Sequence, residues 1–405
     1  MKITAVETFL MQAGPPEETA WSTNTHTASG GMSMGNSRHW LFVRVTTDSG
    51  LYGIGEGSGW PKVVETGVQD LAPLVIGEDP RQINRLWNKL FLGLMGHGIT
   101  GTVGGGAIGA IEMALWDLKG KALNAPIYEL LGGKIRDKVK VYAHASTPAQ
   151  ALKFKSKGYR AFKTGNVKGV VEKVAALRSA LGQEVDLMVD LHGPPWLTVP
   201  DAIAMGRALE PFKLAFLEEP IAPENIAGYR QLRDKISLPL AAGERVTNNL
   251  FAAAPLLREG LIDVVQPDTG RCGGLNQLVK IAALAEACFA SVAPHAGTLG
   301  PVAEHAALQV MAAIPNAMIM EQFAEDWTGR YEVVTHTPTL ENGCLVVPDR
   351  PGLGVDIQID EIAKYPAGHN ASTPNTGSYA EGTEREFVYT QPRWSRCTAF
   401  GLETS

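Results

Sequence analysis

The sequence contains little cysteine, with four cysteines in 405 residues. They are Cys272, Cys288, Cys344 and Cys397, and no two of them form a Cys-x-x-Cys pair. This scatter indicates neither a structural zinc site nor a disulfide framework. We therefore expect free thiols and a reducing compartment.

Long apolar runs and an excess of positive charge are also lacking. No stretch reaches the roughly 18 apolar residues of a membrane-spanning helix, and the N-terminus alternates like a strand, unlike a signal peptide. The 36 basic residues are outnumbered by 42 acidic ones and form no run. This balance argues against nucleic acid or an anionic membrane as the main partner, while a cation fits. We expect a cytoplasmic protein that binds neither nucleic acid nor membrane.

Residues 1–125 have the pattern of an α+β module. Alternating apolar residues around an Asp-Ser-Gly turn predict an antiparallel hairpin in residues 39–59. Residues 82–94 and 107–123 carry apolar side chains at helical spacing. The run GGGAIG, residues 104–109, matches G-x-G-x-x-G, but no suitable strand precedes it. Close packing of a helix explains these glycines better than nucleotide binding does.

From about residue 138, short apolar runs alternate with amphipathic helical segments. Eight such units are typical of a parallel sheet closed into a (β/α)₈ TIM-like barrel, with an open doubly wound sheet as the alternative. We predict an α+β capping domain over residues 1–125 and the barrel over 126–345. A C-terminal segment, 346–405, returns to the cap and ends in a polar arm. The runs are VKVYAH, YRAFKTG, DLMVDLHG, LAFLEEP, PLAAGERV, LIDVVQPD, ASVAPHAG and AMIMEQF.

Most of these runs end in a charged residue or a histidine that packing does not explain. These residues follow one another at intervals of 24 to 28 positions. Solvated loop ends, the alternative, would vary in position and would include Ser, Thr and Asn freely. In a barrel the C-terminal ends of all strands converge on one mouth, where active sites lie. The residues are Lys163, Asp190, Glu218, Glu244, Asp268, His295 and Glu321.

Three consecutive units contribute the carboxylates Asp190, Glu218 and Glu244. In one mouth they would repel one another unless a cation lies between them. Oxygen ligands of this kind suit a hard divalent ion such as Mg²⁺. Only one glutamate of the LEEP run can point inward, and we choose Glu218 over Glu219. Each residue taken alone could be an ordinary surface carboxylate.

The next two units place Asp268 before His295. Neighbouring strand ends allow the carboxylate to hydrogen-bond the imidazole, which sets the tautomer and raises the basicity of the other ring nitrogen. His295 is therefore a candidate general base. A loop histidine is the alternative for His295 taken alone.

The motifs DLHG, LEEP, GER, QPD followed by GG, PHAG and MEQF occur in this order. With these motifs the chain resembles the mandelate racemase-like branch of the enolase superfamily. The earlier segment AIEMALWDLKGKALNAPIYELLGG is also similar to that family, so the likeness covers nearly the whole chain. It implies a capped barrel whose Mg²⁺ stabilises the enediolate formed when a proton next to a carboxylate is removed. It assigns Asp190, Glu218 and Glu244 to the metal, Asp268 and His295 to a catalytic dyad, and Glu321 to the surroundings of the substrate carboxylate.

Two positions separate this chain from the racemase pattern. Racemases of this type carry Lys-x-Lys at the second barrel strand, whereas this chain has Lys163 and then Gly165. We therefore expect Lys163 to steady the substrate carboxylate. His192, two residues after Asp190, resembles the histidine with which acid-sugar dehydratases of the galactonate type protonate the departing 3-hydroxyl, because hydroxide leaves poorly without a proton.

The resemblance thus implies a hydro-lyase that converts an aldonate or aldarate to a 2-keto-3-deoxy acid. If His192 instead acts as a second base, the chain would be a cycloisomerase, epimerase or racemase. A non-catalytic sugar-acid or metal-binding module on the same scaffold is a third alternative. We expect a homo-oligomer.

Four residues are candidates to contact the sugar. His26 lies in the presumed cap. The other candidates are aromatic residues that could line a sugar site, namely Trp60, Trp196 and Trp327, although tryptophan more commonly packs in the core. His97 is a weaker candidate. For the other histidines, including His144, the sequence indicates no carboxylate partner at matching phase.

Overall fold

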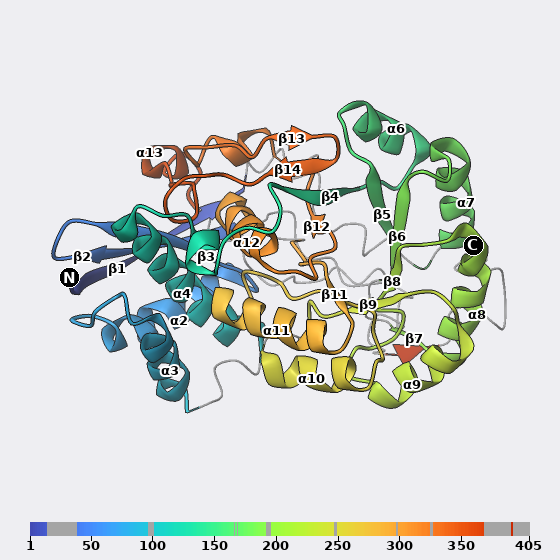
Figure 1. Cartoon of the computed structure of the whole chain (residues 1–405), viewed down its shortest axis with the longest axis horizontal. Coiled ribbons are helices and arrows are strands. Elements are labelled where there is room, and N and C mark those ends of the chain that lie inside the picture. Colours follow the sequence, from blue (N-terminus) through green and yellow to red (C-terminus); the bar gives the residue numbers. More distant parts are fainter. Residues whose placement is uncertain are drawn as a thin grey trace, which may run out of the picture.

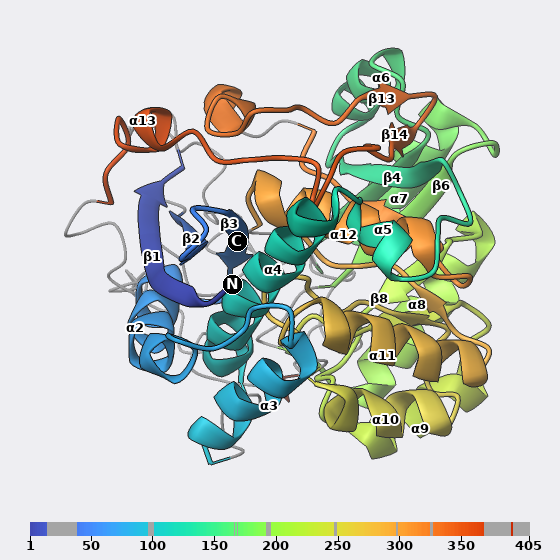
Figure 2. The same cartoon turned by 60° about the vertical axis from the view of Figure 1, so that its left-hand side comes forward.

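The computed structural model describes residues 1–13, 39–95, 101–165, 167, 169–191, 196–246, 249–296, 299–324, 327–367 and 390–391. A three-stranded sheet with its helices lies beside a larger barrel, as Figures 1 and 2 show from two directions. His26, His97 and His192 are outside the described residues.

The capping domain is an antiparallel sheet covered by helices. Its strands pair in the order β1-β2-β3, and the predicted hairpin is the β2–β3 pair. The long helix α4 lies directly on β3, because a Cβ on Gly53 would be 2.1 Å from the carbonyl oxygen of Ala114. The elements are β1 (Ile3–Gln12), β2 (His39–Thr47), β3 (Tyr52–Gly57), α2 (Pro61–Leu71), η2 (Ala72–Leu74), α3 (Ile83–Gly93), α4 (Thr102–Leu123) and α5 (Ile127–Leu130).

The barrel contains the eight strands that the apolar runs predict. The parallel pairs follow the order β4-β5-β6-β8-β9-β10-β11, and β12 pairs with β4. Backbone hydrogen bonds of 2.9 Å join Val292 of β11 to Asn316 and Met318, just before β12, so the strands follow one another around a ring. The strands are β4 (Lys138–His144), β5 (Ala161–Gly165), β6 (Asp186–Asp190), β8 (Phe216–Glu218), β9 (Leu240–Ala242), β10 (Val264–Val265), β11 (Ser291–Val292) and β12 (Met320–Glu321).

A helix follows each barrel strand from β4 to β11 and covers the outside of the ring (Figure 1). Apolar side chains inside the ring, such as Tyr142, Met188 and Phe216, form a small core of their own. The helices are α6 (Pro148–Ser156), α7 (Val170–Leu181), α8 (Val199–Leu209), η3 (Glu210–Phe212), α9 (Ile226–Lys235), α10 (Leu250–Arg258), α11 (Leu275–Ala287), α12 (Pro301–Ala313) and η4 (Thr328–Tyr331).

The chain after the barrel returns to the cap. β13 (Leu340–Glu341) and β14 (Cys344–Val346) form a hairpin whose second strand pairs antiparallel with β4. α13 (Ile359–Ile362) lies near β1, where the Gln12 N–H donates a 3.0 Å hydrogen bond to Tyr365. Of the polar arm, β15 (Thr390–Gln391) pairs with β7 (Trp196–Leu197) on the barrel.

Two buried cap carboxylates hold the barrel helices that follow β10 and β11. Glu56 accepts hydrogen bonds from backbone N–H groups at the start of α12, including Val302 at 3.1 Å and Ala303 at 2.9 Å. Glu112 in α4 does the same for α11, with Leu275 at 2.7 Å. Burial raises the pKa of each carboxyl to about 7, although the backbone donors oppose that rise. The cap therefore holds the segments that follow Asp268 and His295.

The glycine run of α4 packs against the barrel. A Cβ on Gly105 would lie 2.0 Å from the carbonyl oxygen of Arg271, and one on Gly109 would lie 3.0 Å from the backbone nitrogen of Gly274. The packing explanation for GGGAIG is therefore confirmed.

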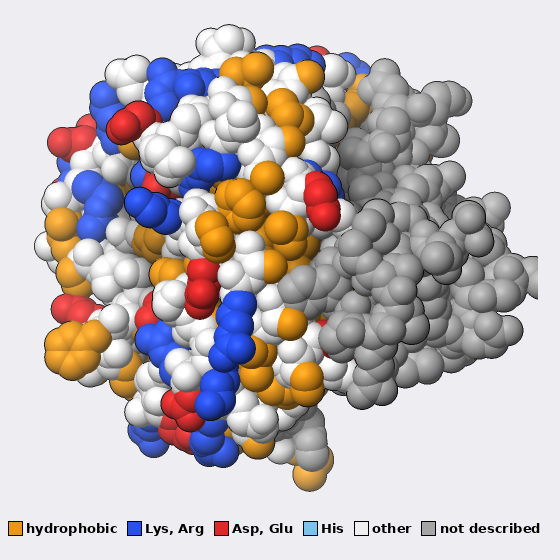
Figure 3. Space-filling model, turned by 90° about the vertical axis from the view of Figure 1, so that its right-hand side faces the viewer, with side chains coloured by type: hydrophobic (Ala, Val, Ile, Leu, Met, Phe, Trp, Pro, Cys, Tyr) orange, Lys and Arg blue, Asp and Glu red, His pale blue; other side chains and the backbone are white. Residues whose placement is uncertain are grey.

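Figure 3 shows the face at the right of Figure 1, where basic and acidic side chains are interspersed among the described residues. Surface pairs such as Arg230–Glu259 and Arg233–Asp263 join charges of opposite sign. Within the described part of the chain, no helix is both long and apolar enough to cross a membrane.

Glu56→Gln should lower the free energy of unfolding by roughly 1–3 kcal/mol, because an amide has one acceptor oxygen and its NH₂ would face backbone donors. Urea unfolding at neutral pH measures this difference. Asp70→Asn, an exposed acid in the same domain, is the control and should change stability little. Equal effects of the two variants would show that Glu56 does not hold α12.

Candidate active site

The polar strand ends lie side by side at the mouth of the barrel. Asp190 and Glu218 are directly paired in the β6–β8 register, and Asp190 also pairs with Gly165 across β5 and β6. Lys163 occupies the next inward position on β5, beside His144 at the end of β4. Parallel pairing brings residues about 27 positions apart into direct contact, which is how the sequence spacing becomes a site.

Lys163 is a buried ammonium among carboxylates. Its Nζ lies 3.0 Å from Glu218 Oε2, 2.9 Å from Glu321 Oε1 and 3.4 Å from Asp190 Oδ2. Burial would lower its pKa, but Glu218 and Glu321 raise the pKa of Lys163 well above its usual value. Lys163 is therefore charged and is the cation that meets these three acidic side chains.

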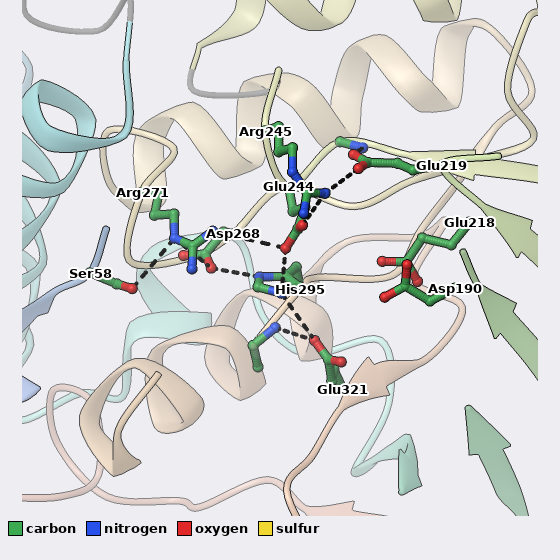
Figure 4. Close-up of polar contacts among 12 residues, drawn as sticks. Ser58, Asp190, Glu218, Glu219, Glu244, Arg245, Asp268, Arg271, His295 and Glu321 are labelled. Atoms are coloured by element: carbon green, nitrogen blue, oxygen red, sulfur yellow. Dashed lines mark hydrogen bonds and ion pairs between the residues drawn. The ribbon is translucent and has the colours of Figure 1, made fainter. Parts of the chain in front are cut away.

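Asp190 and Glu218 face each other (Figure 4). Burial and the charge of Asp190 raise the pKa of Glu218 to about 8, although Lys163 pulls it down. A carboxyl group held in this way gains from any further cation near it. The carboxylate oxygens of Asp190 and Glu218 are therefore suitable ligands for a hard divalent ion.

Glu244, Asp268 and His295 form the other half of the site. Asp268 Oδ2 is 2.7 Å from His295 Nδ1, and Glu244 Oε2 is 2.6 Å from His295 Nε2. Burial would lower the pKa of His295, but Glu244 and Glu321 raise it to about 10. The predicted Asp268–His295 contact is present, and Gly270 N–H fixes Asp268 through Oδ1 at 2.9 Å.

Glu244 is turned toward His295 and away from the Asp190–Glu218 pair (Figure 4). Among the described residues, no three carboxylate, imidazole or thiolate groups meet the geometry of a metal site. The three expected ligands therefore lie in two groups at the mouth. Asp190 and Glu218 face each other, and Glu244 is paired with the imidazole of His295.

Two arginines that the sequence did not single out as site residues complete the charge balance. Arg245 contacts both Glu219 and Glu244, and Arg271 Nε lies 3.4 Å from Asp268 Oδ2 and 3.5 Å from Ser58 Oγ of the cap. Glu219 is fully buried on the far side of the LEEP strand, while Glu218 faces Lys163. The inward choice of Glu218 agrees with this arrangement.

The three tryptophans lie in different surroundings. Trp60 is partly exposed just before α2, with a left-handed φ of 73°. Trp196 is buried in β7, with the Arg245 guanidinium 5.2 Å from its ring centroid. Trp327 is buried between Trp40 and Tyr365, at centroid distances of 5.9 and 4.5 Å.

His144 has a carboxylate partner that the sequence analysis missed. Its Nε2 is 2.6 Å from Glu321 Oε1, and its ring stacks on Phe323. The interpretation of His144 as a histidine without such a partner was therefore wrong. The VKVYAH run does end at His144, and that position was the available signal, but the interval to Lys163 is shorter than the others.

Known families match both domains of this structure. Residues 18–132 match the family described as mandelate racemase / muconate lactonizing enzyme, N-terminal domain, and residues 146–362 match the enolase C-terminal domain-like family. The chain belongs to the enolase superfamily. The capped (β/α)₈ barrel expected from the sequence is the fold of this superfamily member.

Relatives of known activity are similar over most of this enolase-superfamily chain. The D-galactonate dehydratase of Xanthomonas oryzae pv. oryzae is 37% identical over 351 residues, which cover 80% of this chain and 90% of that protein. The D-galactonate dehydratase of Variovorax paradoxus is also 37% identical, over 349 residues, with the same coverage.

Solved structures have the same fold. The 3,6-anhydro-D-galactonate cycloisomerase of Zobellia galactanivorans has a TM-score of 0.79 and 31% identity, covering 90% of this chain and 99% of that one. An enolase from Pantoea ananatis with bound D-gluconate and Mg has a TM-score of 0.76 and 29% identity, covering 90% of this chain and 94% of that one.

Lys163→Met should lower the free energy of unfolding of the metal-free protein by roughly 3–5 kcal/mol, because it leaves buried carboxylates without their cation. Urea unfolding in the presence of a chelator measures the change. Lys173→Met is the matched control, since Lys173 donates to the carbonyl oxygen of Gly165 at 2.9 Å. A loss no larger than that of the control would contradict the charge-balancing role of Lys163.

Proposed function

We propose that the protein is a Mg²⁺-dependent sugar-acid dehydratase that converts an aldonate or aldarate to a 2-keto-3-deoxy acid. The observation that carries this proposal is the convergence of the Asp268–His295 pair and the Asp190–Glu218 pair on one barrel mouth. The likeness to D-galactonate dehydratases and to the gluconate-bound enolase supports a sugar acid as substrate.

Asp190, Glu218 and Glu244 would hold the Mg²⁺. Their oxygen donors and the raised pKa of Glu218 fit a divalent cation, and the Mg in the Pantoea ananatis structure supports this choice. When bound, the ion polarises the substrate carboxyl group and makes the adjacent hydrogen more acidic.

His295 would remove that hydrogen. Asp268 accepts the hydrogen bond of Nδ1–H at 2.7 Å, which leaves Nε2 as the basic atom. In the structure Glu244 lies 2.6 Å from Nε2 and helps to raise the pKa of His295 to about 10, so release of this contact lets Nε2 lose its hydrogen and act as the base. The Asp268 pair then keeps the ring oriented during the transfer.

Lys163 and Glu321 would orient the acid end of the substrate. Lys163 supplies positive charge for a carboxylate, and Glu321 holds Lys163 at 2.9 Å and the Ala296 N–H at 2.6 Å. His192 would protonate the departing 3-hydroxyl, because in the sequence it follows Asp190, the last residue of β6, by two positions. His26, Trp60, Trp196 and Trp327 remain our candidates for contacts with the sugar chain.

A cycloisomerase is the second candidate, favoured by the fold similarity to the Zobellia galactanivorans enzyme. It would use the same base but lose no water. We also propose that the protein is a cytoplasmic homo-oligomer; the free thiols of Cys272, Cys288 and Cys344 fit a reducing compartment.

The reaction is tested with the purified protein, Mg²⁺ and a panel of aldonates and aldarates that includes D-galactonate and D-gluconate. We expect at least one acid to give a 2-keto-3-deoxy product lighter by one water, measured by mass spectrometry and a keto-acid assay. An isomeric product of unchanged mass would support the cycloisomerase instead. Binding of Mg²⁺ without any product from the panel would contradict dehydration.

His192→Asn should separate the two halves of the reaction. Without the acid, elimination should fall by roughly 100-fold or more, while exchange of the α-hydrogen with solvent deuterium continues. His295→Asn is the paired variant and should lose both exchange and elimination. Loss of exchange in His192→Asn would reassign His192 to proton abstraction.

Mg²⁺ should raise the melting temperature of the metal-free protein, because binding to the folded state at about 100 times Kd adds about 2.7 kcal/mol. Glu218→Gln should remove most of this rise, since it deletes one charged ligand. Glu219→Gln, its buried neighbour on the other face, should keep the rise. The same Mg²⁺ response in both variants would place the ion elsewhere.

A further inference from the structure

His144 is the strand-end residue of β4, and the proposed reaction gives it no task. β4 lies between β5, which supplies Lys163, and β12, which supplies Glu321. With His144 the barrel has a polar side chain at or just beyond the end of each of its eight strands. The side chain is 39% exposed, whereas Glu321 beside it is 1% exposed, so His144 reaches open space above a buried partner.

The contacts of His144 fix which ring nitrogen faces that space. Nε2 lies 2.6 Å from Glu321 Oε1, and the ring stacks on Phe323 with centroids 4.9 Å apart and planes at 19°. Burial would raise the pKa of Glu321, but Lys163 and His295 hold it well below its usual value. Glu321 is therefore an acceptor, so Nε2 carries the hydrogen. An imidazole with one N–H has a lone pair on its other nitrogen, which in His144 is Nδ1.

Nδ1 has no hydrogen-bond partner within the described chain, and it is not among the buried atoms that lack one. It is thus an oriented, accessible acceptor. Glu321 lies between the His144 ring and the proposed base. Its Oε1 contacts His144 Nε2, and its Oε2 lies 3.8 Å from His295 Nε2. His144 and the proposed base thus both lie beside Glu321, so a substrate bound at His295 is close to the carboxylate that holds His144.

We propose that His144 is a specificity-determining residue whose Nδ1 accepts a hydrogen bond from one hydroxyl of the sugar acid, while Nε2 anchors the ring to Glu321. This inference rests on the proposed function for the identity of the ligand as a sugar acid. Glu321 and Phe323 already hold the imidazole in place, so it loses little conformational entropy when the sugar acid binds. An acceptor at a fixed position favours the hydroxyl configuration that points toward it over the epimer.

Two substitutions separate the two nitrogens. Gln places its amide at the distance of Nε2, so His144→Gln keeps a donor for Glu321 and loses the acceptor at the Nδ1 position. Asn places its amide at the distance of Nδ1, so His144→Asn keeps a polar group there. His336→Gln is the matched control, because His336 lies in the C-terminal segment in contact with Arg350.

The experiment measures the Kd of D-galactonate and D-gluconate in the presence of Mg²⁺, and KM and kcat for whichever acid reacts. We expect His144→Gln to raise Kd and KM about tenfold, the value of one hydrogen bond to a substrate hydroxyl. Its kcat should change less than about threefold. His144→Asn keeps a polar group at the Nδ1 position but loses the contact with Glu321, so it should raise Kd less than His144→Gln does, and His336→Gln should bind as the wild type does.

A series of deoxy acids, each lacking one hydroxyl, identifies the partner. The tenfold penalty of His144→Gln should vanish for a single deoxy acid and persist for the others. The same penalty on every acid, no penalty on any, a fall in kcat at unchanged KM, or no binding of a sugar acid by the wild type would overturn the assignment. Binding without dehydration by the wild type would refute the proposed function while the Kd series still tests His144.

Discussion

The site depends on the balance of charge around Lys163. Six acidic groups, counting Glu219, gather at or beside one barrel mouth. All but Asp190 are buried, and a buried charge is costly unless a cation or hydrogen-bond donor meets it. Lys163 meets the Asp190–Glu218–Glu321 side, while Arg245, Arg271 and His295 meet the other side. The positive charge nearby is not enough for Glu218, because its pKa remains raised. A divalent cation bound beside Glu218 would therefore stabilise its carboxylate.

The same charges divide the chemistry between the two halves of the mouth. One half has paired carboxylates that fit a metal ion, and the other has an imidazole whose orientation is fixed by Asp268. Glu244 belongs to both, since it is an expected metal ligand and also the partner of His295 Nε2. Glu321 joins the halves by accepting hydrogen bonds from Lys163, His144 and the Ala296 N–H. Proton transfer, metal binding and recognition of the acid are therefore coupled through shared carboxylates.

The cap takes part in this arrangement through the barrel helices. Glu56 and Glu112 bind the N-terminal backbone groups of α12 and α11, which follow the strands that supply His295 and Asp268. The glycines of α4 let its backbone approach the loop after Asp268. Because the cap and the dyad share these contacts, the capping domain also holds the base in place.

The sequence alone determined the family, the eight strands and the seven strand-end residues, because a parallel barrel repeats its unit in sequence and brings every strand end to one rim. Tertiary structure alone decided the pairings that no period encodes. His144 meets Glu321 across 177 positions, and Glu56 meets Gly300 across 244. It also decided that Arg245 links Glu219 to Glu244 and that Trp327 packs against Trp40 and Tyr365. Such contacts depend on how a cap strand, a barrel helix and the returning C-terminal segment pack against one another. The spacing of residues along the chain does not predict this packing.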